Sequence, residues 1–221
     1  MFMKWCFSLF ILLCCSTTLS SKDIHVEYFV KTKGITIGKL VWNLKITENY
    51  YETTIELKEK GFLSGLYDFR GSYATFGKIK NKLLIPSQYS QSWTTKKKQR
   101  DVKIYFKDHK INELNLMPLE KEHPRISYKN LEGYNDPLTS FINILLNSSL
   151  SRTIDGRRTY LMEVKKIQNH KKIFISEYTN IWADHKKNDL EYLEVFQNKR
   201  DLLPKKIIIK FKGSIFYLIN N

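Results

Sequence analysis

KLVWNLKI, residues 39–46, decides the fold, because apolar side chains alternate with mostly polar ones along it. Every second residue is apolar, and these residues are Leu40, Trp42, Leu44 and Ile46. The residues between them are mostly polar or charged, as at Lys39, Asn43 and Lys45. Neighbouring side chains of an extended strand point to opposite faces, so this period of two indicates a strand with one buried face and one face in water.

The same alternation recurs through residues 23–117, for example at 102–106, and it resumes at 160–164 and 207–211. Glycines and Pro86 interrupt it at the spacing of turns and bulges. Half-buried strands that follow one another through short turns are typical of antiparallel sheets. The sequence therefore predicts a mainly β protein built on an antiparallel sheet.

A different period occurs once, in residues 136–146. The apolar residues with the spacing of a helix stripe are Leu138, Phe141, Ile142, Leu145 and Leu146. Asp136 is a suitable N-cap, and Pro137 suits the first turn, where its missing N–H is no loss. One short amphipathic helix cannot cover the apolar faces of so many strands. We therefore expect a strongly curved sheet, a barrel or half-barrel, with this helix as its plug.

Residues 1–20 have the pattern of a secretory signal peptide, with Lys4 before an apolar run at 5–15 and small or polar residues after it. The run is shorter than the roughly 20 residues of a transmembrane helix, although an uncleaved anchor remains an alternative. We expect residues 21–221 to form a single β-rich domain. All 3 cysteines lie in the expected signal, so the mature chain would have no disulfide and no thiol chemistry.

The chain is basic, with a formal net charge of +15. Its lysines are spread along the chain rather than gathered on one segment. The densest run, at 96–100, has no interleaved aromatic residues to stack on bases, and it indicates a solvated strand end or hairpin loop. We predict no nucleic-acid partner, and at most a peripheral contact with anionic membrane surfaces.

TIDGRRTY, residues 153–160, contains an Asp-Gly pair that indicates a turn. Asp155 and Gly156 both accept left-handed conformations at low cost. Arg157 and Arg158 then begin a strand, so their side chains should point to opposite faces. The two arginines are therefore not expected to form a paired anion clamp.

Several short motifs follow one another along the chain. They are GFLSGLY at 61–67, PSQY at 86–89, NDPLT at 135–139, DGRR at 155–158 and LPKK at 203–206. In this order, and behind the signal-like segment, they resemble the bacterial family called domain of unknown function 3108, over nearly the whole chain after residue 20. The resemblance implies a Gram-negative periplasmic protein of mainly β structure, and it implies no established activity or cofactor.

Motifs for catalysis are missing from the sequence. There is no nucleophile elbow, phosphate-binding loop or dinucleotide fingerprint. The 5 histidines are scattered, and no pair of them has the helical spacing of metal ligands. The best local metal candidate is 120–123, Glu-Lys-Glu-His, but a solvated loop before Pro124 is the simpler interpretation. We therefore predict that the protein is not an enzyme and holds no metal or cofactor.

Two classes of function remain. The first is an exported, non-enzymatic binding or carrier protein that holds a lipid or another apolar ligand inside the curved sheet. The predicted ligand-binding residues are Trp42, Leu138, Phe141, Ile142 and Leu145. Trp93 and Trp182 are expected on strands, where a tryptophan is most often core but could line a cavity. The second class is a structural or assembly factor of the cell envelope that contacts another protein. A large apolar cavity would favour the first class, and a filled core with an exposed apolar patch the second.

Overall fold

The computed structural model describes residues 21–59, 69–183 and 189–220. These residues form one 13-stranded sheet whose strand pairs are all antiparallel. The strands up to residue 117 are β1 (Lys22–Thr32), β2 (Ile35–Ile46), β3 (Tyr50–Glu59), β4 (Phe69–Lys80), β5 (Leu83–Thr95), β6 (Lys98–Lys107) and β7 (Lys110–Met117). The later strands are β8 (Leu150–Ile154), β9 (Arg158–Ile167), β10 (His170–Asn180), β11 (Leu190–Phe196), β12 (Lys206–Phe211) and β13 (Ser214–Asn220). Between the two sets lie a 3-10 turn, η1 (Tyr128–Asn130), and one α-helix, α1 (Pro137–Leu145).

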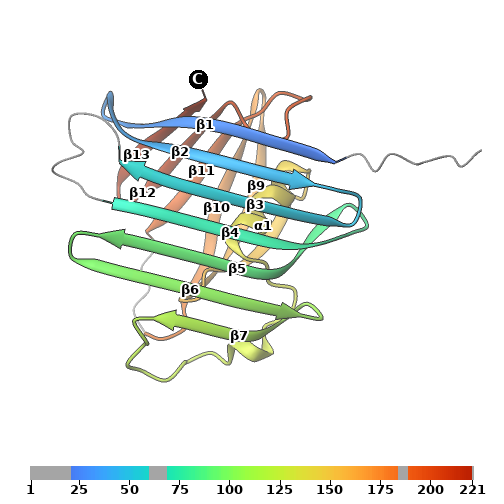
Figure 1. Cartoon of the computed structure of the whole chain (residues 1–221). Helices are drawn as coiled ribbons and strands as arrows, with labels where there is room; N and C mark the ends of the chain where they lie inside the picture. Colours follow the sequence, from blue (N-terminus) through green and yellow to red (C-terminus); the bar gives the residue numbers. More distant parts are fainter. Residues whose placement is uncertain (1–20, 60–68, 184–188, 221) are drawn as a thin grey trace, which may run out of the picture.

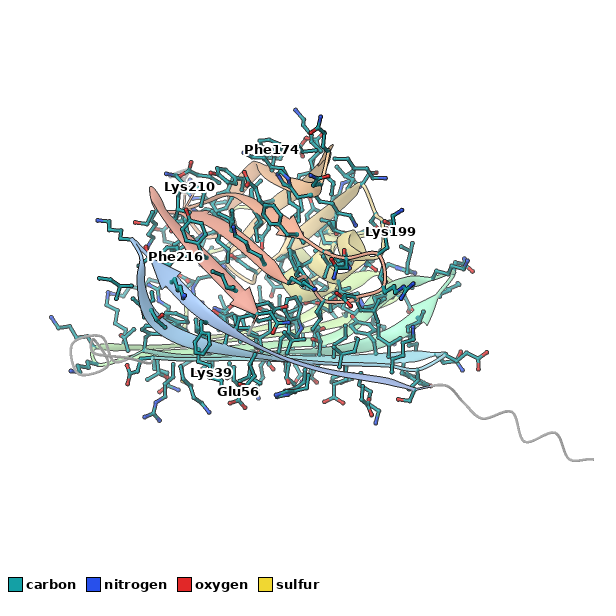
Figure 2. The ribbon with its side chains drawn as sticks, turned by 90° about the horizontal axis from the view of Figure 1, so that it is seen from above. Lys39, Glu56, Phe174, Lys199, Lys210 and Phe216 are labelled. Carbon is teal, nitrogen blue, oxygen red and sulfur yellow. The ribbon has the colours of Figure 1, made fainter. Side chains whose placement is uncertain are left out.

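The order of the strands explains the shape of the sheet. It runs β7-β6-β5-β4-β3-β2-β1-β13-β12-β11-β10-β9-β8, so β1 and β13 lie side by side in its middle. The halves on either side of this pair curve over one another, with β1–β7 in front of β9–β13 in Figure 1. Figure 2 shows them from above as two layers with side chains between them. The predicted strongly curved antiparallel sheet is confirmed, in its open form, because β7 and β8 end the strand order without pairing.

The segment between β7 and β8 spans the gap that these two edge strands leave. Glu132 forms a bridge with Lys110 of β7, and Asn135 forms a bridge with Thr153 of β8. Ile154 N also donates to Asn135 O at 2.9 Å. Unpaired edge groups are sites for unwanted strand pairing, so these bridges protect part of both edges.

Helix α1 lies between the two layers and contacts β4, β5 and β8. Asp136 is its N-cap, and the Asp136 Oδ1 atom accepts from Leu138 N and Thr139 N at 3.0 Å each. Pro137 is the first helical residue, as the sequence predicted. The helix is buried from Leu138 to Leu145, so it fills the interior that the curved sheet encloses.

The alternation in the sequence matches the two faces of the sheet. Trp42 and Leu44 of β2 are buried in the interior. Figure 2 shows Lys39 and Glu56 on the outer side of the layer that contains β2 and β3. It also shows Phe174 and Lys210 on the outer side of the other layer. The expected signal peptide at 1–20 and the GFLSGLY motif at 61–67 lie outside the described residues.

Candidate functional site

The five predicted ligand-binding residues all lie in the interior. Their side chains are almost fully buried: Trp42, Leu138, Phe141, Ile142 and Leu145. The rings of Trp42 and Phe141 lie 5.7 Å apart between centroids and are tilted by 35°. Trp42 Nε1 donates to Thr53 Oγ1 at 2.7 Å. The indole is therefore held by the ring contact with Phe141 and by this hydrogen bond. These residues pack helix against sheet, and ligand contact by them stays a prediction.

A buried polar cluster attaches the start of α1 to the sheet. Asp136 and Thr139 are completely buried, and Thr139 Oγ1 donates to Asp136 Oδ2. Thr75 Oγ1 of β4 donates to the same carboxylate oxygen at 3.0 Å. Tyr51 Oη of β3 lies 2.6 Å from Thr139 Oγ1. Burial raises the pKa of Asp136 to about 6, although the hydrogen bonds from Thr139 and Thr75 act in the opposite direction.

Further polar contacts hold the rest of the helix. Asn143 pairs with the backbone of Leu84 in β5: its Oδ1 atom accepts from Leu84 N, and its Nδ2 atom donates to Leu84 O, both at 2.9 Å. Ser140 Oγ accepts from Thr153 Oγ1 of β8 at 2.7 Å. At the C-terminal end, Lys171 Nζ donates to Ile144 O at 2.9 Å, where a cation is favoured by the helix dipole. Among the described residues, no buried side-chain nitrogen or oxygen lacks a partner. The helix is therefore a fixed plug.

An apolar pocket lies in the same interior, beside this filled region. Its volume is about 730 Å³, and it opens to solvent. The described residues that line it come from both layers: Val30, Ile37, Leu40, Leu57, Phe69, Tyr73, Trp93, Thr95, Lys96, Lys97, Ile209, Phe211, Phe216 and Leu218. Leu40 lines the pocket, and Trp42, two positions further along the same face of β2, packs against α1. The helix thus fills one part of the interior and leaves the neighbouring part open.

Glycine at position 71 helps to form this pocket. A Cβ atom at Gly71 would lie 2.8 Å from Trp93 Cε3, so only glycine lets the indole lie flat across β4. Trp93 stacks on Phe69, with ring centroids 5.7 Å apart and an interplanar angle of 11°. The two stacked rings give the pocket a broad apolar wall. Trp93 therefore has the cavity-lining role that the sequence left open, whereas Trp182 donates from Nε1 to the backbone of Gly156.

A second pocket, of about 570 Å³, lies beside α1 and is more polar. Its lining includes His109, Tyr134, Asn143 and Arg152. Asn143 is already fully engaged with the backbone of Leu84. Ser151, which also lines this pocket, donates from Oγ to Ser140 Oγ at 2.9 Å. We therefore assign no chemistry to this pocket.

The Asp-Gly-Arg-Arg segment forms the predicted turn. Gly156 has a φ of +89°, in the left-handed region. Arg157 Nε donates to Glu120 Oε1 at 2.6 Å, whereas Arg158 Nη1 donates to Tyr178 Oη at 2.7 Å. The two guanidinium groups have different partners, so this segment acts as scaffold.

The part of the chain that the structure describes contains no group of three or more His, Cys, Asp or Glu side chains placed to hold a metal ion. Glu120, in the segment that was the best metal candidate, is paired with Arg157. Within the same residues, no helix has both the length and the apolar character to cross a membrane.

Comparison with known proteins gives a fold and no activity. No family model matches the chain, and no curated protein matches it either. The chain is similar in structure to a β-barrel-like protein of domain of unknown function DUF1849 from Brucella abortus. The TM-score is 0.50 at 9% sequence identity, and the likeness covers 90% of this chain and 95% of that chain. At this identity the likeness shows a shared β-barrel-like fold alone.

Most residues that line the apolar pocket were not predicted from the sequence. Ile209 and Phe211 belong to the alternation at 207–211, but no pattern in the sequence showed that they line one pocket with Leu57 and Trp93. The pairing of β1 with β13 brings these segments together, and it joins residues that are far apart in the sequence, as in Tyr28 with Asn220, 192 positions later. The only local signal for these lining residues was the period-two alternation, which continues to the end of each strand.

Proposed function

We propose that this chain is a non-enzymatic binding or carrier protein for a lipid or another apolar ligand, held in the pocket lined by Trp93 and Phe216. The observation that carries this proposal is the pocket of about 730 Å³, whose lining is apolar except near its rim. Ligand pockets of proteins have volumes of roughly 300–1,000 Å³ and mainly apolar walls. Covering apolar surface contributes about 25 cal/mol for each Å², so an apolar ligand gains free energy by entering.

The arrangement of the scaffold supports this reading. The polar groups around α1 are satisfied, and the core next to Trp42 is closely packed. The same interior holds the pocket lined by Leu57 and Leu218, and α1, the one α-helix of the described residues, lies beside Trp42 instead. If the interior served only to stabilise the fold, filling this space with side chains would increase the stability of the protein. The open region is therefore better explained by a ligand than by a need of the fold.

The alternative is an assembly factor of the cell envelope that acts through protein contacts. It rests on a smaller observation: Met117 of β7 and Leu119 just after it are 62% and 83% exposed, beside an edge strand. Single exposed apolar side chains are common on protein surfaces. The larger, continuous apolar pocket favours the binding protein.

Export belongs to the proposal as well. The signal-like segment at 1–20 supports secretion. The periplasm as the destination comes from the sequence resemblance to domain of unknown function 3108, which no matching family model confirms. N-terminal sequencing of the protein from a periplasmic fraction tests both points. We expect a chain that begins near Ser21. A chain that keeps Met1 and sediments with the membranes would contradict export by a cleaved signal.

The binding function is tested with N-phenyl-1-naphthylamine, an uncharged fluorophore that brightens in apolar surroundings. We expect saturable binding to the wild-type protein. The variant Phe216→Asp places a charge in the pocket and should weaken binding by more than about tenfold, because burying an unpaired charge is costly. The matched control is Ile215→Asp on the other face of β13, where Ile215 is 36% exposed. Equal binding by all three proteins, or none by the folded wild type, would contradict the proposal.

A further inference from the structure

Among the described residues, the charged side chains that line the apolar pocket are all basic. Among the described lining residues, Lys96 and Lys97 are the charged ones, and both are exposed at the rim. Glu59 lies near the pocket but does not line it. Its Oε2 atom accepts a hydrogen bond from Phe69 N at 2.9 Å. Two exposed cations therefore border the apolar lining of the pocket.

The fold fixes where these cations stand. Lys96 and Lys97 form the turn of the hairpin between β5 and β6. Thr95 Oγ1 accepts from Lys98 N at 3.1 Å and donates to Lys98 O at 3.2 Å, so the turn is held at its base. Trp93, whose ring forms the pocket wall, lies three residues before Lys96 on the same hairpin. The turn and the wall are thus parts of one hairpin.

Lysine suits this position chemically. Its four-carbon stem covers apolar surface while its ammonium group stays in water, so it can contact both the tail and the head of an amphiphile. An ammonium group attracts a carboxylate or a phosphate as a point charge without demanding one fixed geometry. The apolar wall and the two lysines together match a molecule with one apolar chain and one anionic head.

We propose that the ligand is an anionic single-chain amphiphile, with its chain against Trp93 and Phe216 and its head beside Lys96 and Lys97. This inference rests on the binding function proposed above and narrows its ligand class. It also assigns a role in selectivity to a lysine run that the sequence indicated only as a solvated turn.

The test is competition against N-phenyl-1-naphthylamine by three probes with the same chain: myristate, myristyl alcohol and myristylamine, each below its aggregation threshold. We expect myristate to compete best at low salt, with an advantage over the alcohol of about two- to fivefold for each lysine. The advantage should shrink as salt is added, because exposed charges are screened. A lysophosphatidate with the same chain shows whether a phosphate head is preferred to a carboxylate.

The variant pair separates a local effect from the general positive charge of the protein. Lys96→Gln with Lys97→Gln should remove the preference for myristate and keep binding of the uncharged fluorophore. The control is Lys80→Gln with Lys82→Gln, the same loss of charge at the β4–β5 turn, which lies at the opposite end of β4 from Phe69. Equal competition by myristate and the alcohol, or equal effects of both variant pairs, would overturn the inference and leave the binding function standing. Failure of the wild type to bind the fluorophore would instead remove the binding function itself.

Discussion

The hydroxyl group of Thr75 donates to the carboxylate of Asp136 at 3.0 Å, which joins strand β4 to the first turn of α1 in the buried interior. The same carboxylate caps the helix by accepting from two backbone N–H groups. One side chain therefore both starts the helix and fixes its position on the sheet. Because the helix fills one part of the interior, the place where it is fixed also decides where the apolar pocket begins.

The first prediction concerns the pH dependence of stability. Burial raises the pKa of Asp136 to about 6 in the folded protein, from an ordinary value of 3.8. Between these two values the folded protein binds a proton that the unfolded chain has lost, so the free energy of unfolding falls as pH rises from about 4 to about 6. Asp136 should account for a fall of about 2–3 kcal/mol. Urea unfolding at a series of pH values measures it.

The isosteric variant Asp136→Asn isolates this contribution. It keeps a helix cap but carries no charge, so the difference in stability between wild type and variant should change across the same pH window. Asp23→Asn, at an exposed carboxylate, is the control for removing a charge. A constant difference between wild type and Asp136→Asn from pH 4 to pH 6 would show that the capping hydrogen bonds fully offset burial.

The second prediction concerns the middle of the helix. Asn143→Leu removes two hydrogen bonds and leaves the buried N–H and C=O groups of Leu84 without their side-chain partner. We expect a loss of about 2–4 kcal/mol in the free energy of unfolding, measured by urea denaturation. Asn115→Leu, at an exposed position of β7, is the matched control and should change stability little. If the two variants lost the same amount, the Asn143 contacts would not anchor the helix.

The sequence was sufficient to predict the sheet and the helix. Period-two alternation is a local signal, and residues such as Leu40 and Trp42 carry it without reference to the rest of the chain. The helix start at Asp136 was equally local, because a cap and the proline that follows it are neighbours in sequence. Both predictions are confirmed by the structure.

The pocket was not predictable in the same way. Whether Leu57 meets another side chain or an empty space depends on what lies opposite it, and that depends on the curvature of the sheet and on strand pairing between distant segments. The position of the helix over Trp42, rather than over Trp93, depends on polar contacts such as the one between Asn143 and Leu84. Inward apolar residues have the same pattern in both cases, so no sequence period distinguishes a packed core from a lined cavity.

The third prediction compares two glycines with positive φ. Gly156 and Gly213 have φ values of +89° and +73°. A Cβ atom at Gly156 would lie 2.5 Å from Val102 Cγ1, whereas nothing lies within 4 Å of a Cβ atom at Gly213. Gly213→Ala should therefore lower the free energy of unfolding by about 1–2 kcal/mol, because of backbone conformation alone. Gly156→Ala should cost about 1–3 kcal/mol more, because the new methyl group overpacks against the core. Thermal and urea unfolding of the two variants test the difference, and equal losses would show that Val102 gives way freely.

The last prediction joins the shape of the pocket to binding. Gly71→Ala places a methyl group 2.8 Å from Trp93 Cε3, so the indole must tilt away from β4 and from its stack on Phe69. The tilted ring would enter the space that the ligand occupies, so we expect binding of N-phenyl-1-naphthylamine to weaken by about fivefold or more. The tryptophan emission of the unliganded protein should change as well. Ser72→Ala, the next residue of β4 on its exposed face, is the matched control and should leave both signals unchanged. Unaltered binding by a folded Gly71→Ala protein would mean that the Trp93 wall does not contact the ligand, and the bound chain would then have to lie nearer to Phe216 and Leu218.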